Sequence, residues 1–367
     1  MFDKNLKIKV IEYISVLLLL FSLSYLSFGV NILNKEIVAP MDLLLQYPGY
    51  KESGFYLTLN NPERTDIVDS FFPSVMFVKR EISVHGVYPL WNYLRNYGNP
   101  VSFDLSTLIV LFFDFITNNI GIAFTLFLFL KLTIAGFGTY LMCRENLGFI
   151  PSLFASVTFM FCGFMCSWLM WSQTTVAMFI PYVVYLTRRL FETLDIKYTF
   201  FLALVIALTI MSNFPFIAAV GIIITIFNIF IYCVYYLNKT KKLISAFYVF
   251  LIGFVTILCG LLLSAINILA FIEWSNIVDI QWRKGGSILS PTDIDVLWNL
   301  KYYYNISGNI IPAVEKTGYV GLQTLILSVF SSLFVLPFIR KKLKNVIQNS
   351  NIQSKKCCKV KLNTILQ

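Results

Sequence analysis

The stretch N-I-G-I-A-F-T-L-F-L-F-L-K-L-T-I-A-G-F-G-T-Y-L-M, residues 119–142, decides the fold class of this chain. A helix needs about 20 predominantly apolar residues to cross a hydrocarbon core of about 30 Å, and this run exceeds that length. The single charged residue of this stretch is Lys131, and the charged pair Arg144-Glu145 lies just beyond the end of the stretch. The stretch therefore predicts a membrane-spanning helix with one lysine inside it.

The composition of the whole chain agrees with that prediction. Hydrophobic residues make up 57% and charged residues only 13%, which excludes an ordinary soluble domain. The net charge of +10 does not indicate nucleic-acid binding, because the basic residues collect at helix ends, where they suit anionic lipid headgroups. None of the seven cysteines falls in the two acidic segments described below, so we expect no disulfide framework.

Further apolar runs predict a polytopic, all-α membrane protein. Together with residues 119–142 they give about eight crossings. The other predicted crossings are residues 10–33, 148–169, 174–187, 198–212, 215–237, 243–271 and 319–339. The run at 105–116 is apolar but short, and we expect it to form an interfacial or re-entrant helix inside the first loop.

Charge asymmetry predicts the orientation of the bundle. The acidic residues gather in two polar segments, about 34–118 and 272–318, whereas most lysines and arginines lie in the N-terminus, the short connectors and the last residues. Basic loops stay cytoplasmic, so both acidic segments are expected outside and both termini inside the cell membrane. We expect residues 1–340 to form one transmembrane module and 341–367 a basic, disordered cytoplasmic tail.

Asp66 and Asp69 are the candidate catalytic residues. Their spacing of three places both carboxylates on one face of a helix. Such a pair suits a general base, and Asp66 is also a candidate ligand for a divalent cation through its oxygens. The alternative is structural, since acidic residues in a first helical turn offset the helix dipole.

A second set of residues suits the binding of a phosphate or a sugar. Arginine and lysine near a membrane surface can hold a lipid-linked phosphate, and aromatic residues beside amides and carboxylates suit sugar rings. Interfacial anchoring is the alternative for the aromatic residues, and snorkelling is the alternative for the intramembrane lysine. The predicted set is Lys79, Arg80, Trp91, Asn92, Lys131, Glu273, Arg283 and Lys284.

Several short motifs follow one another over about residues 60–325. They are Asp66 with Pro73, Pro-Leu-Trp-Asn at 89–92 with Gly98-Asn99-Pro100, Ala-Gly-x-Gly-x-Tyr at 135–140, Glu273 with Ser290-Pro291, and Tyr319 with Gly321. The order of these motifs resembles that in the YfhO-type bacterial membrane proteins, which have the GT-C glycosyltransferase architecture. Asp69 stands where the family more often has glutamine, and this chain is shorter than most members.

The resemblance implies a GT-C-like helical bundle with a long external first loop. It implies transfer of a sugar from a polyprenyl-phosphate donor to a cell-envelope polymer or glycolipid on the outer face. Asp66 would then act as the base or as a metal-linked carboxylate that helps to hold a divalent cation as cofactor. Two alternatives stay open: a transporter or flippase for a lipid-linked sugar, and a non-catalytic membrane partner of a glycosyltransferase.

Overall fold

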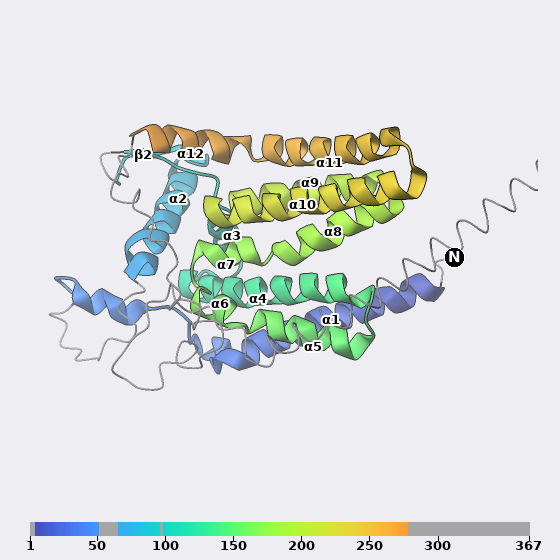
Figure 1. Ribbon diagram of the computed structural model, residues 1–367. Coiled ribbons are helices and arrows are strands. Elements are labelled where there is room, and N and C mark those ends of the chain that lie inside the picture. Colours follow the sequence, from blue (N-terminus) through green and yellow to red (C-terminus); the bar gives the residue numbers. More distant parts are fainter. Residues whose placement is uncertain (1–3, 51–64, 96–97, 278–367) are drawn as a thin grey trace, which may run out of the picture. The chain divides into compact units, whose positions relative to one another are not determined.

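The computed structural model describes residues 4–50, 65–95 and 98–277, all of which belong to one compact unit, Met1–Ser287. The predicted helix at 319–339, the predicted tail, Arg283 and Lys284 lie outside the described residues. Helices dominate the described part, and a two-stranded antiparallel hairpin completes it (Figure 1).

The elements follow one another from a long first helix through an irregular segment to a helical bundle. The first half comprises α1 (Lys4–Phe28), η1 (Ile32–Asn34), η2 (Met41–Gln46), η5 (Ile67–Phe71), α2 (Phe72–His85), β1 (Trp91–Asn92), β2 (Asn99–Pro100), α3 (Leu105–Thr117) and α4 (Ile120–Arg144). The second half comprises α5 (Phe149–Met160), α6 (Gly163–Ser167), α7 (Ser172–Ala177), α8 (Ile180–Thr193), α9 (Ile196–Met211), α10 (Pro215–Thr240), α11 (Leu243–Leu263) and α12 (Ala265–Ile277).

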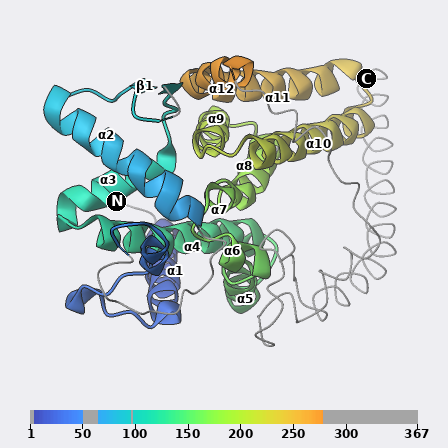
Figure 2. The same cartoon turned by 90° about the vertical axis from the view of Figure 1, so that its left-hand side faces the viewer.

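Helix α4 lies at the centre of the unit. It packs against α1, α3, α5 and α8, and Figure 2 shows it enclosed by these neighbours. Because α4 is apolar on all sides, every face of it can be buried. Its side chains Phe124, Phe127 and Leu128 belong to the main hydrophobic cluster, which also includes Phe72 and Val75 of α2. The main cluster thereby fixes the start of α2 against the start of α4.

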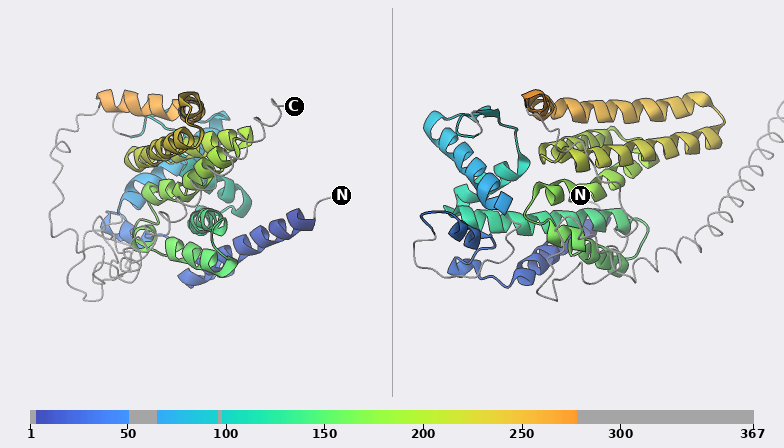
Figure 3. Two further views of the ribbon diagram at one scale, coloured as in Figure 1. Left: turned by 45° about the vertical axis from the view of Figure 1, so that its right-hand side comes forward. Right: turned by 60° about the vertical axis from the view of Figure 1, so that its left-hand side comes forward.

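A second group of helices packs beside α4. Helices α9, α10 and α11 contact one another, and α8 joins them to α4 (Figure 3). Gly260 of α11 allows a close approach to α9, since a Cβ at this position would lie 2.7 Å from Ile206 Cγ2 and 3.0 Å from the Ala203 carbonyl oxygen. Small residues at such crossings are typical of helices that pack inside membranes.

Four described helices are long and apolar enough to cross a membrane: Lys7–Phe28, Ile120–Arg144, Pro215–Thr240 and Leu243–Leu263. Most of the window in α4 is buried in protein (72%), whereas α1, α10 and α11 bury only 17–22%. Their outward faces carry large apolar side chains that water would not favour. These helices indicate a membrane protein, and α4 forms its protein-enclosed core.

The predicted helices at 119–142, 198–212 and 215–237 agree closely in their bounds with α4, α9 and α10, and of these α4 and α10 are long enough to cross a membrane. Residues 105–116 form the separate short helix α3. Three other predictions were wrong, because each predicted single helix is divided into two helices in the structure. Residues 148–169 form α5 and α6, residues 174–187 lie in α7 and α8, and residues 243–271 form α11 and α12. The first helix also ends at Phe28, five residues early, where Gly29 takes a positive φ of 62°.

Local chemistry accounts for two of these breaks. Ser264 ends α11, and its hydroxyl donates to the Gly260 carbonyl at 3.0 Å in competition with the helical backbone bond. Pro181 stands in the first turn of α8, where its missing N–H leaves the preceding turn unsupported. A smoothed hydropathy profile does not register either effect, because the chain stays apolar through both breaks.

Candidate functional site

Asp66 stands at the start of a wide helical turn that leads into α2. The turn, Ile67–Phe71, has the i→i+5 pattern of a π-helix, and the Phe72 N–H donates to the Ile67 carbonyl. Pro73 lies two residues after this turn and has no N–H to donate back to it, which favours the wider pattern. Asp66 is exposed while Ile67 and Val68 beside it are buried, so an apolar anchor holds the carboxylate at the surface.

Asp69 differs from Asp66 in having a direct partner. The Tyr47 hydroxyl donates a short hydrogen bond to Asp69 Oδ1, and this bond raises the pKa of Tyr47 above its ordinary value. The two predicted carboxylates therefore differ: Asp69 links η5 to the end of η2, whereas Asp66 makes no such link.

The remaining described carboxylates of the first acidic segment all have partners. Glu81 accepts from the Tyr93 hydroxyl at 2.9 Å, which raises the pKa of Tyr93, and Asp114 pairs with Lys79 at 2.6 Å. Glu36 accepts the Asn31 N–H, Asp104 accepts from Thr107, and Asp42 also has a polar or ionic partner. Among the described carboxylates of residues 34–118, Asp66 alone has neither a hydrogen bond nor an ion pair.

The predicted binding residues occupy different parts of the described structure. Lys79 forms an ion pair with Asp114, whereas Arg80 is exposed on the same helix. Trp91 and Asn92 form β1, and Asn92 Oδ1 accepts the Leu94 N–H at 2.9 Å in a tight turn. Glu273 is exposed on α12.

Trp91 lies over Gly98 in the hairpin. A Cβ at Gly98 would come within 2.6 Å of Trp91 Nε1, and Gly98 has a φ of +106° that favours glycine. The indole remains partly open, with 46% of the residue exposed. A partly exposed indole is suited to stacking on a sugar ring.

Lys131 is fully buried near the middle of α4, about 17 Å from its first residue at 1.5 Å per residue. Its ammonium donates to the Leu169 carbonyl at 2.7 Å, the Trp171 carbonyl at 3.0 Å and the Thr174 hydroxyl at 3.2 Å. The ring of Phe127 lies 4.7 Å away. All three N–H donors thus have acceptors, two in the turn between α6 and α7 and one, Thr174, in α7 itself.

Asp104 has a buried carboxylate oxygen, and no pattern in the sequence singled this residue out as a candidate site residue. It caps α3, and its Oδ2 accepts from the Thr107 N–H at 2.9 Å and the Thr107 hydroxyl at 2.8 Å. Its Oδ1 is buried and has no hydrogen-bond partner in the described structure. Burial raises the pKa of Asp104, while the bonds to Thr107 and the charge of Lys131 oppose that rise.

Other polar groups adjoin Asp104. The Asn267 amide donates to the Phe103 carbonyl at 3.0 Å, which ties α12 to the segment before α3. The Tyr88 hydroxyl donates to the Ser102 carbonyl at 3.0 Å, and burial raises its pKa to about 12. The capping pattern Asp-x-x-Thr was readable in the sequence, but the burial of this carboxylate depends on contacts from α4 and α12.

No group of three or more histidine, cysteine or acidic side chains in the described ranges is arranged to hold a metal ion. A divalent cation at Asp66 therefore stays a prediction.

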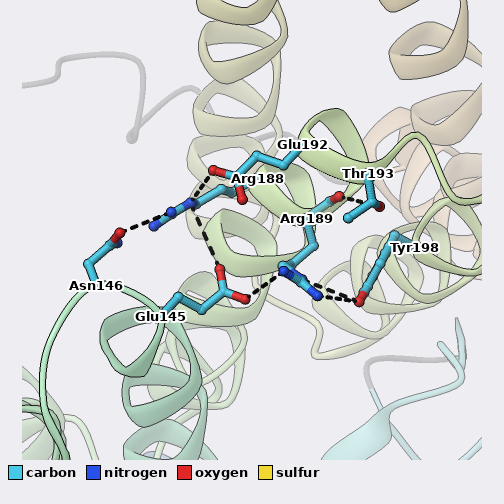
Figure 4. A network of polar contacts seen from close by, with 7 residues as sticks. All are labelled: Glu145, Asn146, Arg188, Arg189, Glu192, Thr193 and Tyr198. Atoms are coloured by element: carbon cyan, nitrogen blue, oxygen red, sulfur yellow. Dashed lines mark hydrogen bonds and ion pairs between the residues drawn. The ribbon is translucent and has the colours of Figure 1, made fainter.

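At the other end of α4, a network of ion pairs links several helices (Figure 4). Arg189 pairs with Glu145 at 3.1 Å and donates to the Tyr198 hydroxyl, while Arg188 pairs with Glu192 at 2.8 Å and donates to the Asn146 side chain at 3.0 Å. Burial raises the pKa of Glu145, although both arginines oppose the rise. This network ties the ends of α4, α8 and α9 together.

Comparison with known proteins adds no assignment, since no family model, no curated protein and no solved structure matches the chain.

Proposed function

We propose that this chain is a membrane glycosyltransferase-like protein that transfers a sugar from a polyprenyl-phosphate donor to a cell-envelope acceptor. In this proposal it lies in a bacterial cytoplasmic membrane with a GT-C-like bundle of about eight crossings and both termini cytoplasmic. The apolar helices and the order of the YfhO-like motifs support the proposal.

The proposal rests on one observation: the Asp66 carboxylate is exposed and makes no hydrogen bond or ion pair with the described residues. A general base must be accessible to the proton it takes, and a neighbouring donor or cation that already holds the carboxylate weakens it as a base. Each of the other described carboxylates in the first acidic segment already has a partner, whereas Asp66 is exposed and has none. Ile67 and Phe72 also anchor it to the main hydrophobic cluster, so the carboxylate is presented from a rigid support.

The proposed reaction is a displacement at the anomeric carbon. Asp66 takes the proton of an acceptor hydroxyl as the hydroxyl oxygen bonds to the anomeric carbon. The bond from that carbon to the phosphate oxygen breaks, and the polyprenyl phosphate leaves with the electron pair. A nearby cation stabilises the negative charge on the leaving phosphate.

Among the predicted cations, Arg80 is the one that the described structure leaves exposed for this role. Lys79 has Asp114 as a close partner, and the three donors of Lys131 already have acceptors. Arg283 and Lys284 lie outside the described residues and stay predictions. Trp91, which is partly exposed, is the proposed stacking platform for the sugar.

Mass spectrometry of envelope glycolipids and polymers tests the proposal. Four strains are compared: one lacking the gene, one with it restored, one carrying Asp66→Asn and one carrying Glu36→Gln. Glu36 serves as the control because it lies in the same segment and accepts a backbone N–H. A sugar that is absent in the deletion and in Asp66→Asn but present in the other two supports the proposal. An unchanged glycan profile in the deletion strain favours the non-catalytic partner instead.

Transport of a lipid-linked sugar is a second candidate, favoured by the interrupted helices α5–α6 and α7–α8. Their connecting turn meets Lys131 near the middle of α4. Interrupted helices that meet near the middle of a membrane are typical of transporters. Purified protein that moves a fluorescent lipid-linked sugar across vesicles without cleaving it would favour this candidate.

A further inference from the structure

A polar hollow of about 400 Å³ opens at the Arg144 end of α4, where α1, α4 and α8 meet. Arg144 is 20 residues from Phe124, which packs near the Asp66 turn, so the two regions are about 30 Å apart along the helix. The hollow is therefore separate from the proposed transferase site. Its lining consists of Lys9, Glu12, Tyr13, Leu141, Arg144, Glu145, Tyr185, Arg188, Arg189 and Glu192.

The carboxylates of the hollow are already neutralised. Both oxygens of Glu12 accept from Arg144, at 2.6 and 3.2 Å. Glu145 pairs with Arg189 at 3.1 Å, and Glu192 pairs with Arg188 at 2.8 Å (Figure 4). With four basic and three acidic side chains in the lining, one positive charge is in excess.

Lys9 is the residue that contributes this excess. It is exposed, and no carboxylate of the described structure lies within 4.0 Å of its ammonium. Arg188 uses Nε and Nη2 in the network, which leaves Nη1 without an acceptor among the described residues. The hydroxyls of Tyr13 and Tyr185 likewise have no hydrogen-bond partner in the described ranges. The hollow thus combines spare donors with a spare positive charge.

We infer that this hollow binds a phosphate group, supplied by the headgroup of an anionic phospholipid. Unused N–H and O–H donors around an excess positive charge match the oxygens of a phosphate. The hollow lies at the ends of α1 and α4, two helices long enough to cross a membrane, where headgroups are found. The charge pattern predicts that this end faces the cytoplasm, whose leaflet is rich in anionic lipid.

Thermal unfolding of the full-length protein in detergent tests the inference. Phosphatidylglycerol, phosphatidylcholine and inorganic phosphate are titrated separately into wild type, Lys9→Gln, Tyr185→Phe and Lys7→Gln. Lys7→Gln is the matched control, because Lys7 is an exposed lysine of the same helix that does not line the hollow. Tyr185→Phe removes only a hydroxyl and preserves the packing of the ring.

Phosphatidylglycerol is expected to raise the unfolding temperature of wild type and Lys7→Gln. Lys9→Gln should bind it roughly tenfold more weakly, the effect of losing one charge-assisted hydrogen bond, and Tyr185→Phe should weaken it less. Stabilisation by phosphatidylglycerol alone identifies a lipid headgroup, and equal stabilisation by inorganic phosphate identifies a free phosphate. Equal affinity in Lys9→Gln and Lys7→Gln, or an equal response to phosphatidylcholine, would overturn the inference.

Discussion

At the scale of single residues, the buried ammonium of Lys131 is the strongest constraint on the core. Burying a charge costs several kcal/mol unless it is compensated, and here three acceptors surround it. These acceptors lie in the turn between α6 and α7 and in the first half of α7, so one side chain of α4 ties this region to the core.

Replacing Lys131 with methionine should destabilise the protein by about 2–4 kcal/mol, because the Leu169 and Trp171 carbonyls would lose a buried donor. Chemical unfolding of the detergent-solubilised protein measures the change. The surface variant Lys197→Met serves as the control, since the Lys197 side chain is 57% exposed and solvent screens its pair with Asp195. An equal loss in both variants would show that the buried bonds of Lys131 contribute no special stability.

Asp104 should make stability depend on pH. Burial raises its pKa in the folded protein above the ordinary value of 3.8, so the folded state binds the proton more tightly than the unfolded state. The free energy of unfolding should therefore fall as pH rises from about 4 through the folded pKa, and level off above it.

Asp104→Asn should lack this fall, because an amide caps α3 equally well but does not titrate. The free energy of unfolding of wild type and Asp104→Asn is measured between pH 4 and pH 8, at about one point per pH unit, and the two pH dependences are compared. Parallel curves would mean that Asp104 does not titrate in this range.

The two residues differ in how far the sequence could predict them. Lys131 stands out because a lysine inside an apolar run is rare, and the structure places it in the protein core. In the sequence, Asp104 looks like an ordinary helix N-cap, and nothing there indicates that its carboxylate is buried. Its burial arises from chain segments that meet only in the folded protein, and no local pattern reports them.

At the scale of elements, hydropathy predicts helices well and predicts their interruptions poorly. The limits of α4 and α10 follow from uninterrupted apolar runs with polar residues at both ends. The breaks at Ser264 and before α8 depend on a single hydroxyl or proline in an otherwise apolar run. Such a residue does not always break a helix, because the partner helices decide whether the chain bends there.

Close packing of α9 against α11 leads to a prediction at this scale. Gly260→Ala should destabilise the protein by about 1–3 kcal/mol, because the added methyl group would press on Ile206 and the Ala203 carbonyl. Gly148→Ala is the control, since the nearest atom to its Cβ would be Pro151 Cδ at 3.8 Å. Thermal unfolding in detergent distinguishes the two. Similar unfolding temperatures for both variants would show that the α9–α11 crossing tolerates a larger residue.

At the scale of the whole molecule, the charge pattern predicts the side on which each connector lies. Reporters fused at Asp195 and Lys241 should be cytoplasmic, whereas reporters at Asn34 and Asn213 should be external. Alkaline phosphatase is active only outside and a fluorescent protein only inside, so the pair of reporters marks each position. Phosphatase activity at Asp195 would reverse the predicted orientation and move the Asp66 turn to the cytoplasmic side.

The sequence indicates the class of the molecule more securely than its activity. Long apolar helices follow directly from the thickness of a membrane. A catalytic site depends on which carboxylates remain free. The spacing of Asp66 and Asp69 does not distinguish them, whereas in the structure Tyr47 bonds to Asp69 alone. The proposal of sugar transfer therefore depends on Asp66.

The most direct test measures the release of free polyprenyl phosphate from a lipid-linked sugar. Vesicles containing the purified full-length protein are supplied with donor lipids and an envelope acceptor fraction. Wild type and Glu36→Gln should release the carrier at the same rate, whereas Asp66→Asn should be slower by about 10²–10⁴-fold, as expected for loss of a general base. Equal rates in Asp66→Asn and Glu36→Gln would contradict the account.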